Sequence, residues 1–300
     1  MTVFEAGRAS ASRHVLAEGP VWVASNSRIL WVDIDRGSVF IGRLVGGTIE
    51  QSHHFDLGGT VGAAVAGDDD SILVAAADRL VVFRADGSRF EGPVIVGAGV
   101  NGRLNDGACD PAGRFVVGTL SLDGRKGKER LVRLEFDGTV TVLDSDLTLS
   151  NGIAWSPDGT LMYSTDTASG IIWVRDYDVS TGVVGGRRAH LRFHDGSPDG
   201  ICVDSRGSLW VALWGAGEVH SFLPSGEPAD VVTVPVPHVS SVAFVGDHLD
   251  RLLVTTSSRD LSEHDLLLYP DAGRLFLVDV GVAGLATPAW ASAALRSSTD

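Results

Sequence analysis

The 300-residue sequence is poor in several features on which large classes of proteins depend. It has only two cysteines, Cys109 and Cys202, which are too few for a disulfide framework. Its 24 Lys and Arg stand against 38 Asp and Glu, and the formal net charge of −14 disfavours nucleic acid and anionic membranes as partners, because both select basic surfaces. No apolar run reaches about 18 residues, the length at which a membrane-spanning helix is expected. Residues 1–18 lack the apolar core of a secretory signal, so the sequence predicts a cytoplasmic protein.

The short motifs of several enzyme classes are also missing. There is no G-x-S-x-G nucleophile elbow, no phosphate-binding P-loop and no H-E-x-x-H zinc helix. The segment Gly97-Ala-Gly-Val-Asn-Gly102 matches G-x-G-x-x-G, but it leads into another apolar strand and not into a helix. We therefore interpret it as a loop. Short apolar runs rich in Val, Ile, Leu and Trp, separated by Gly, Pro, Asp and Ser, predict strands and hairpins along the whole chain.

One pattern recurs along the chain: a polar residue, a glycine, a short apolar strand, a tight turn and a second apolar strand. Clear copies begin at Asn105, Asn151 and Asp199. Degenerate copies begin at Glu18, Val61 and Ser240. The period of roughly 41 to 48 residues is typical of the blades of a β-propeller. The sequence therefore predicts an all-β, six-bladed β-propeller with four antiparallel strands per blade.

This propeller is expected to be a single domain spanning residues 1–300, with a frayed C-terminal tail at about 291–300. A closed ring needs its two ends joined, because an open blade would expose unpaired strand edges. The stretch Thr2–Ala6 is therefore predicted to pair with the last blade. The polar segment Leu120–Arg130 is predicted to be a surface loop.

The first residues of the repeats are predicted to form a ring. In a propeller the first strand of each blade lies along the central channel, and all the first strands run in the same direction. Their opening residues then gather at one mouth of the channel: Glu18, Val61, Asn105, Asn151, Asp199 and Ser240. A single Asn or Asp before Gly is usually turn chemistry. Two carboxylates and two amides at one point are instead a hard-oxygen set suited to Ca²⁺, Mg²⁺ or Mn²⁺, because crowded carboxylates need a cation or a shared proton.

Four segments together resemble one known family. They are Ala17-Glu-Gly-Pro-Val-Trp, Arg103-Leu-Asn-Asp-Gly-Ala-Cys-Asp-Pro, Ser150-Asn-Gly-Ile-Ala-Trp and Pro198-Asp-Gly-Ile-Cys-Val-Asp. They are similar to segments of the SMP-30/gluconolactonase/regucalcin family, and Tyr269-Pro-Asp-Ala-Gly-Arg resembles the start of that family's last hairpin. The resemblance runs in order from about residue 14 to about residue 285, so it covers most of the chain.

The resemblance implies a six-bladed propeller with one divalent metal ion in the channel. It would place the metal on Glu18, Asn151 and Asp199, and Arg103 and Asn105 against the substrate. Asp123 stands where the family often has Glu, which makes it a further candidate for substrate binding. The sequence leaves open whether the metal is Ca²⁺, Mg²⁺, Mn²⁺, Zn²⁺ or Fe²⁺. It also leaves open whether His238, just before the sixth copy of the repeat, is a loop residue or contacts the substrate.

The function most consistent with these residues is hydrolysis of a sugar-acid lactone, such as an aldonolactone, by a gluconolactonase-like hydrolase. Lactone hydrolysis builds negative charge on the carbonyl oxygen, which a divalent ion can stabilise while it activates water. Asp199 is the candidate general base for that water. Three alternatives remain: a calcium-binding regulatory protein of the regucalcin type, a phosphotriesterase or xenobiotic lactonase on the same fold, and a propeller scaffold for protein partners. Apart from a small lactone, the sequence predicts no partner.

Overall fold

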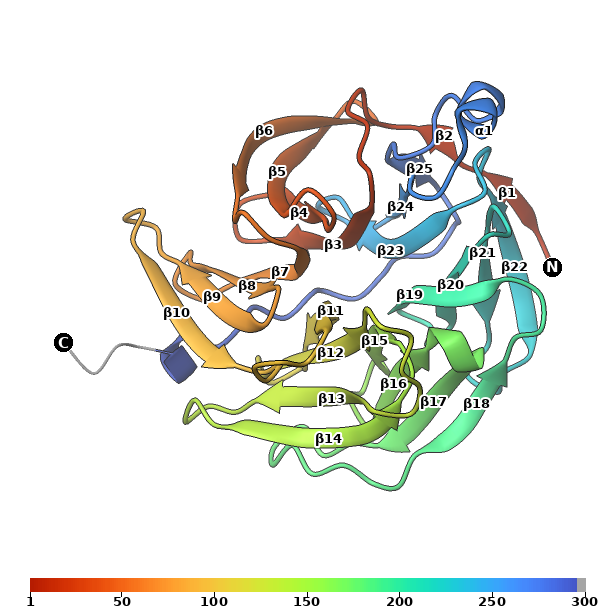
Figure 1. Cartoon of the computed structure of the whole chain (residues 1–300). Coiled ribbons are helices and arrows are strands. Elements are labelled where there is room, and N and C mark those ends of the chain that lie inside the picture. Colours follow the sequence, from red (N-terminus) through yellow and green to blue (C-terminus); the bar gives the residue numbers. More distant parts are fainter. Residues whose placement is uncertain (296–300) are drawn as a thin grey trace.

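The structure, a computed structural model, describes residues 1–295 and confirms the predicted six-bladed β-propeller (Figure 1). Six sheets surround a central channel, and in each sheet four antiparallel strands lead from the channel to the outer edge. Helical structure is sparse in this part of the chain, and its α-helix, α1 (Glu263–Leu268), lies in a loop of blade six. Within the described residues, no helix has the length and apolar character needed to cross a membrane.

The blades follow one another along the chain. Blade one contains β3 (Ala17–Val23), β4 (Arg28–Asp33), β5 (Ser38–Val45) and β6 (Thr48–Asp56). Blade two contains β7 (Val61–Ala66), β8 (Ile72–Ala76), β9 (Arg79–Phe83) and β10 (Arg89–Val94). Blade three contains β11 (Gly102–Cys109), β12 (Phe115–Ser121), β13 (Glu129–Leu134) and β14 (Val140–Leu147). The loop predicted over Leu120–Arg130 is shorter in the structure: it spans residues 122–128, and the two residues at each end of the predicted range belong to β12 and β13.

The second half of the chain repeats this order. Blade four contains β15 (Ser150–Trp155), β16 (Leu161–Asp166), β17 (Ile171–Asp176) and β18 (Arg188–Arg192). Blade five contains β19 (Ser197–Val203), β20 (Leu209–Trp214), β21 (Glu218–Phe222) and β22 (Pro228–Thr233). Blade six contains β23 (Val239–Val245), β24 (Arg251–Thr256) and β25 (Phe276–Val278), and its fourth strand comes from the other end of the chain.

The N-terminal segment closes the ring differently from the prediction. The stretch expected on the last blade forms β1 (Val3–Glu5), which pairs in parallel with β22 of blade five. Only the next two residues, β2 (Gly7–Arg8), pair with β25 and complete blade six. The reason is geometric: β25 has three residues and needs only a short partner, whereas the chain before it covers the exposed edge of β22.

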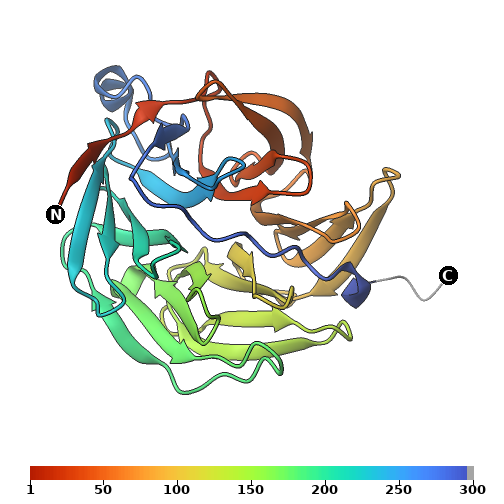
Figure 2. The same ribbon diagram turned by 180° about the vertical axis from the view of Figure 1, so that it is seen from behind.

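The C-terminal segment crosses one end of the channel (Figure 2). It is attached on one side where the Gly284 amide donates to the Leu249 carbonyl at 2.8 Å, and on the other where the Trp290 amide donates to the Ala66 carbonyl at 2.8 Å. Residues 292–295 form a short 3-10 helix where the sequence suggested a frayed end, and the rest of that predicted tail lies outside the described residues. This crossing segment therefore passes over one end of the channel and contributes to its wall.

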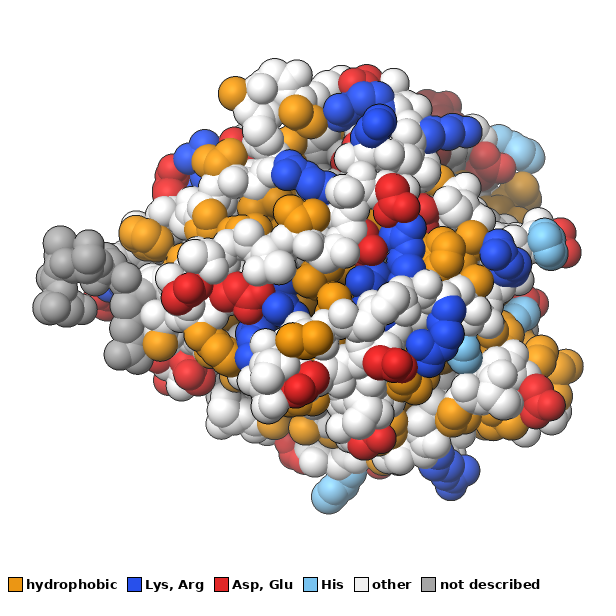
Figure 3. Space-filling view, turned by 90° about the horizontal axis from the view of Figure 1, so that it is seen from below, with side chains coloured by type: hydrophobic (Ala, Val, Ile, Leu, Met, Phe, Trp, Pro, Cys, Tyr) orange, Lys and Arg blue, Asp and Glu red, His pale blue; other side chains and the backbone are white. Residues whose placement is uncertain are grey.

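Apolar side chains from adjacent blades pack between the sheets. Trp31 and Trp210 are fully buried in two such interfaces, each in a cluster that also takes residues from a neighbouring blade. The outer surface is mixed in charge, and Figure 3 shows Lys and Arg interspersed with Asp and Glu on one side of the molecule. Ion pairs such as Arg187 to Asp144, at 3.0 Å, contribute to this pattern at the outer edge of the propeller. The packed blades hold the innermost strands, and hence the ring residues, in place.

Candidate functional site

Each of the six innermost strands has a break in its pairing register near its first residues. The breaks fall between Glu18 and Val21, Val61 and Ala63, Leu104 and Gly107, Asn151 and Ile153, Pro198 and Ile201, and Val239 and Ser241. Such a bulge bends the strand and redirects a side chain, and bulges are common beside active sites. The predicted ring residues therefore stand at positions where the strand leaves its regular pairing.

The glycines of the repeat explain how the innermost strands come so close together. A Cβ on Gly152 would lie 2.6 Å from the carbonyl oxygen of Asp199, on the next blade. A Cβ on Gly62 would lie 2.3 Å from the carbonyl oxygen of Asn105, again on the next blade. Any larger residue would push the strands apart, since atoms at such distances overlap. In the pattern of a polar residue followed by Gly, the polar side chain is thus available for the site, and the glycine allows the close contact that positions the innermost strand of the next blade.

The channel mouth formed by the strand starts is a cavity of about 420 Å³, which we call the upper pocket. Its lining includes five of the six predicted site residues: Glu18, Arg103, Asn105, Asn151 and Asp199. Further lining residues come from loops, among them Trp214 and Arg259. The structure therefore brings together a predicted metal-binding set and two predicted substrate-binding residues, drawn from four blades.

Two carboxylates in the upper pocket are strongly perturbed. Glu18 and Asp199 are each only 5% exposed. Burial raises the pKa of Glu18 well above its usual range, and the charges of Asp199 and Asp106 raise it further. Burial and the charge of Asp106 likewise raise the pKa of Asp199. Among residues 1–295 neither carboxylate forms a salt bridge, although the charge of Arg103, which also lines the pocket, lowers both pKa values in part.

The same residues offer free oxygen ligands. Asn151 donates a hydrogen bond from Nδ2 to Asp199, whereas its Oδ1 is buried and accepts no hydrogen bond. No group of three or more His, Cys, Asp or Glu side chains in the described part of the chain is arranged to hold a metal ion. The present set consists instead of two carboxylates and an amide. An unpartnered amide oxygen beside two buried carboxylates fits a divalent ion that prefers oxygen.

Arg103 and Asn105 are fixed by one another. Arg103 donates from Nη1 to Asn105 Oδ1 at 2.7 Å and to the Leu104 carbonyl at 2.9 Å. Asn105 in turn donates from Nδ2 to the Ser150 carbonyl at 2.8 Å, on the next blade. Burial, and then repulsion by Arg259, lowers the pKa of Arg103 to about 10, which leaves it protonated at neutral pH. The pocket thus has a rigid cationic donor opposite its carboxylates.

Two candidates from the sequence lie outside this lining. The Asp123 carboxylate is on the exposed loop between β12 and β13, where it pairs with Arg125 Nε at 2.8 Å. Its assignment to substrate binding stays a prediction. His238 donates a hydrogen bond from Nδ1 to the Arg259 carbonyl at 3.0 Å, and its ring stacks on Trp214 with 4.2 Å between the ring centroids. His238 therefore supports two residues that line the upper pocket and does not line it.

Sequence reasoning missed Asp106 and Arg259. Asp106 stands directly before Gly107, the position that Asn151 and Asp199 occupy before their own glycines, and this alignment was an available signal. Burial raises its pKa to about 6, and its charge acts on both Glu18 and Asp199. Arg259 comes from a loop after the second strand of blade six, a region without a repeated pattern. Only the fold brings it to the upper pocket.

Known proteins resemble this chain in both sequence and structure. Residues 16–258 match the family described as SMP-30/Gluconolactonase/LRE-like region. The chain is 37% identical over 276 residues to the pentonolactonase of Haloferax volcanii, covering 90% of this chain and 92% of that protein. It is 33% identical over 297 residues to the L-arabinolactonase of Azospirillum brasilense, covering 93% of each. A crystal structure of the calcium-binding protein regucalcin from Agrobacterium tumefaciens, 26% identical, superposes with a TM-score of 0.90 over 97% of this chain and 99% of that one. The chain therefore belongs to the SMP-30/gluconolactonase family.

Proposed function

We propose that this protein hydrolyses the lactone of a sugar acid, an aldonolactone, in the upper pocket with the help of one divalent metal ion. The observation that carries the proposal is the meeting of two buried carboxylates, the unpartnered Oδ1 of Asn151 and the fixed guanidinium of Arg103. Relatives named as a pentonolactonase and an L-arabinolactonase support this substrate class.

The residues would divide into two groups by role. Glu18, Asn151 and Asp199 would hold the metal ion. Arg103 and Asn105 would donate hydrogen bonds to hydroxyl and carbonyl oxygens of the lactone and so orient the ring. When bound, the metal ion would supply Lewis-acid stabilisation of the carbonyl oxygen and a lower pKa for water.

The reaction itself would need one proton acceptor. As the oxygen of water bonds to the lactone carbonyl carbon, the Asp199 carboxylate would take a proton from that water. The bond between the carbonyl carbon and the ring oxygen would then break, and the ring oxygen would take the proton that Asp199 had accepted, which makes it a hydroxyl group and restores the Asp199 carboxylate. The product is the open-chain hydroxy acid. Asp199 is suited to this because burial raises its pKa above the usual range of an aspartate, which makes its carboxylate a stronger base.

An assay of Asp199→Asn across a metal titration tests this role. Asn keeps an oxygen ligand of similar size but accepts no proton. With occupancy verified by metal analysis, we expect kcat for an aldonolactone, followed by pH-stat, to fall at least ~10²-fold. Substantial rescue by excess metal would mean that Asp199 acts only as a ligand. A wild-type protein that hydrolyses none of a panel of aldonolactones, with metal bound, would overturn the proposed function.

A second function is favoured by one observation, the close structural match to a calcium-binding regucalcin. The same oxygen ligands would then bind calcium without turnover. A phosphotriesterase or a lactonase for xenobiotics would use the same pocket on a different ester. Metal content, followed by assays of sugar lactones, other lactones and a phosphotriester with and without chelator, separates these functions.

A further inference from the structure

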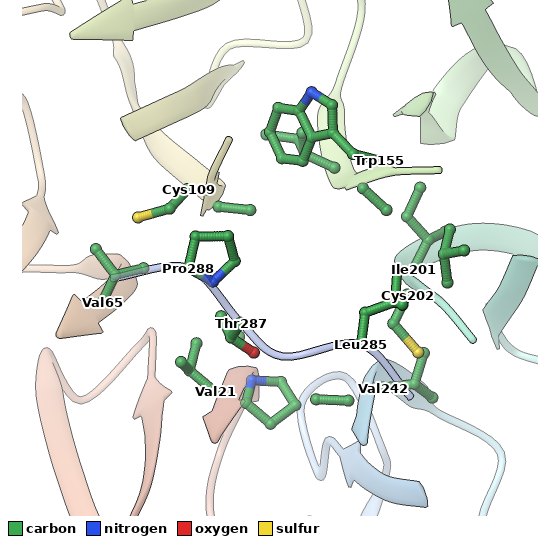
Figure 4. Close-up of a pocket in the computed structure, with 18 of the residues that line it drawn as sticks. Val21, Val65, Cys109, Trp155, Ile201, Cys202, Val242, Leu285, Thr287 and Pro288 are labelled. Atoms are coloured by element: carbon green, nitrogen blue, oxygen red, sulfur yellow. The ribbon is translucent and has the colours of Figure 1, made fainter. Parts of the chain in front are cut away.

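The opposite end of the channel contains a second cavity, of about 380 Å³, which we call the lower pocket (Figure 4). It is lined by the later residues of the innermost strands and by the crossing C-terminal segment. Most of its walls are apolar: Val21, Val65, Trp155, Val242, Leu285 and Pro288. Its size falls in the range of about 300–1,000 Å³ that is typical of pockets for small molecules.

Asp106 is the one charged residue among those that line the lower pocket. Its Oδ1 accepts a hydrogen bond from the Gly107 amide at 2.7 Å. No Lys, Arg or His in residues 1–295 forms a salt bridge with it, although the structure has many such pairs elsewhere. A carboxylate deep in an apolar cavity is costly without a partner. The lower pocket therefore combines apolar walls with a single uncompensated negative charge.

The crossing C-terminal segment, which forms one side of the lower pocket, is hydrogen-bonded to the blades only at its two ends. Gly284 and Trp290 bond to the blades, as described above. Between them, residues 285–289 form no backbone hydrogen bond in the described structure, and three of these five residues are exposed. A segment held by two fixed points and little between them can shift to admit a ligand, because few contacts oppose its movement.

We propose that the lower pocket is a second binding site, for a small organic amine whose ammonium group pairs with Asp106 and whose apolar body fills the cavity. A sugar lactone does not fit this chemistry, because the walls offer few hydrogen-bond donors for its hydroxyl groups. A bare metal ion does not fit either, since one carboxylate among apolar side chains cannot complete its oxygen shell. An alkylammonium ion fits both features, because its charge pairs with the carboxylate and its alkyl chain packs against the apolar walls.

Calorimetry with n-hexylamine and 1-hexanol tests the site without any assay of activity. The protein is saturated with a divalent ion and held at about pH 8, where the amine is protonated. We expect hexylamine to bind saturably at one site and hexanol to bind at least ~10-fold more weakly, because a buried ion pair adds well over the ~1.4 kcal/mol that corresponds to tenfold. Equal binding of the two, or no saturable binding of hexylamine at millimolar concentration, would overturn the proposal.

Variants locate the bound amine. Asp106→Asn should reduce hexylamine affinity at least ~10-fold, to the level of hexanol. Ala243→Phe places a large side chain in the lower pocket, where Ala243 is partly exposed, and should abolish binding of both compounds. The control Asp260→Asn changes an exposed carboxylate of the upper pocket and should leave hexylamine affinity unchanged. Binding that survives Ala243→Phe in a folded protein, or that is lost in the control, contradicts the proposed site.

Discussion

Gly152 and Asp199 meet across the boundary between blades four and five, with room for a hydrogen atom and not for a methyl group. A Cβ on Gly152 would stand 2.6 Å from the Asp199 carbonyl oxygen and 2.7 Å from the Ile201 amide nitrogen. The adjacent Asn151 side chain donates to the Asp199 carboxylate at the same boundary. The spacing of two blades and the geometry of the site therefore depend on the same contact.

Replacing this glycine should affect stability and the site together. Gly152→Ala is expected to cost about 1–3 kcal/mol in the free energy of unfolding, because the neighbouring backbone must move. It should also weaken divalent-ion binding. The control is Gly186→Ala in the same blade, where a Cβ meets nothing within 4 Å and the change should stay within about 0.5 kcal/mol. Denaturant unfolding of both variants provides the measurement, and equal stabilities would contradict the argument.

The metal-binding set can be tested one residue at a time. Glu18→Gln, Asn151→Ala and Asp199→Asn should each weaken divalent-ion binding, because each removes charge or a coordinating oxygen. Asp123→Asn is a matched control on the exposed loop and should leave metal affinity unchanged. Calorimetry with Ca²⁺ and Mn²⁺ measures the affinities, and wild-type affinity in any of the three excludes that residue as a ligand.

Arg103 should act on substrate and not on metal. Arg103→Ala is expected to lower kcat/KM for an aldonolactone while metal affinity hardly changes, because a cation does not coordinate another cation. Arg103→Lys should recover little, since the guanidinium donates in a fixed geometry that an ammonium group lacks. Steady-state kinetics and metal titrations of the same variants measure the two effects separately. Loss of metal affinity in Arg103→Ala would contradict a role for Arg103 in substrate binding alone.

The free energy of unfolding of the metal-free protein should depend on pH in a way that reflects the titration of Asp106. Its pKa rises from 3.8 to about 6 in the fold because of burial, so the fold favours the protonated form. Its contribution to stability is full below about pH 4 and is lost as the pH rises through about 6. With a chelator present, Asp106→Asn should gain stability relative to wild type between these pH values. Calorimetric melting across that range measures the difference, and a constant difference would refute the assignment.

The N-terminal segment should stabilise two blades by separate contacts. Removing residues 1–6 would expose the edge of β22, and removing residues 1–8 would also expose the edge of β25. We expect a lower Tm in both cases and a larger loss, of at least ~4 °C, in the longer deletion. Thermal melting followed by circular dichroism tests this, and an unchanged Tm in the longer deletion would show that these strands contribute nothing.

Much of the architecture was readable from the sequence because each blade carries its own local pattern. The polar–Gly start, the apolar strands and the Asp-containing turns repeat at a blade's spacing, and they led to the six-bladed fold and to a ring that includes Glu18, Asn151 and Asp199. The hydrogen bonds that define a turn join residues only a few positions apart, so a turn can be recognised from the sequence alone. The carboxylate of Asp110, for example, accepts from the Ala112 and Arg114 amides in the turn that the sequence indicates.

Tertiary structure alone decided the features that depend on contacts between distant segments. β1 joined blade five and not blade six, because the free edge of β22 lies along the path of the chain. Arg259 lines the upper pocket from a loop with no motif, and the crossing C-terminal segment forms part of the wall of the apolar cavity that contains Asp106. A raised pKa, an unpaired charge and a cavity arise from burial by residues far away in the sequence, so no local pattern of residues can specify them.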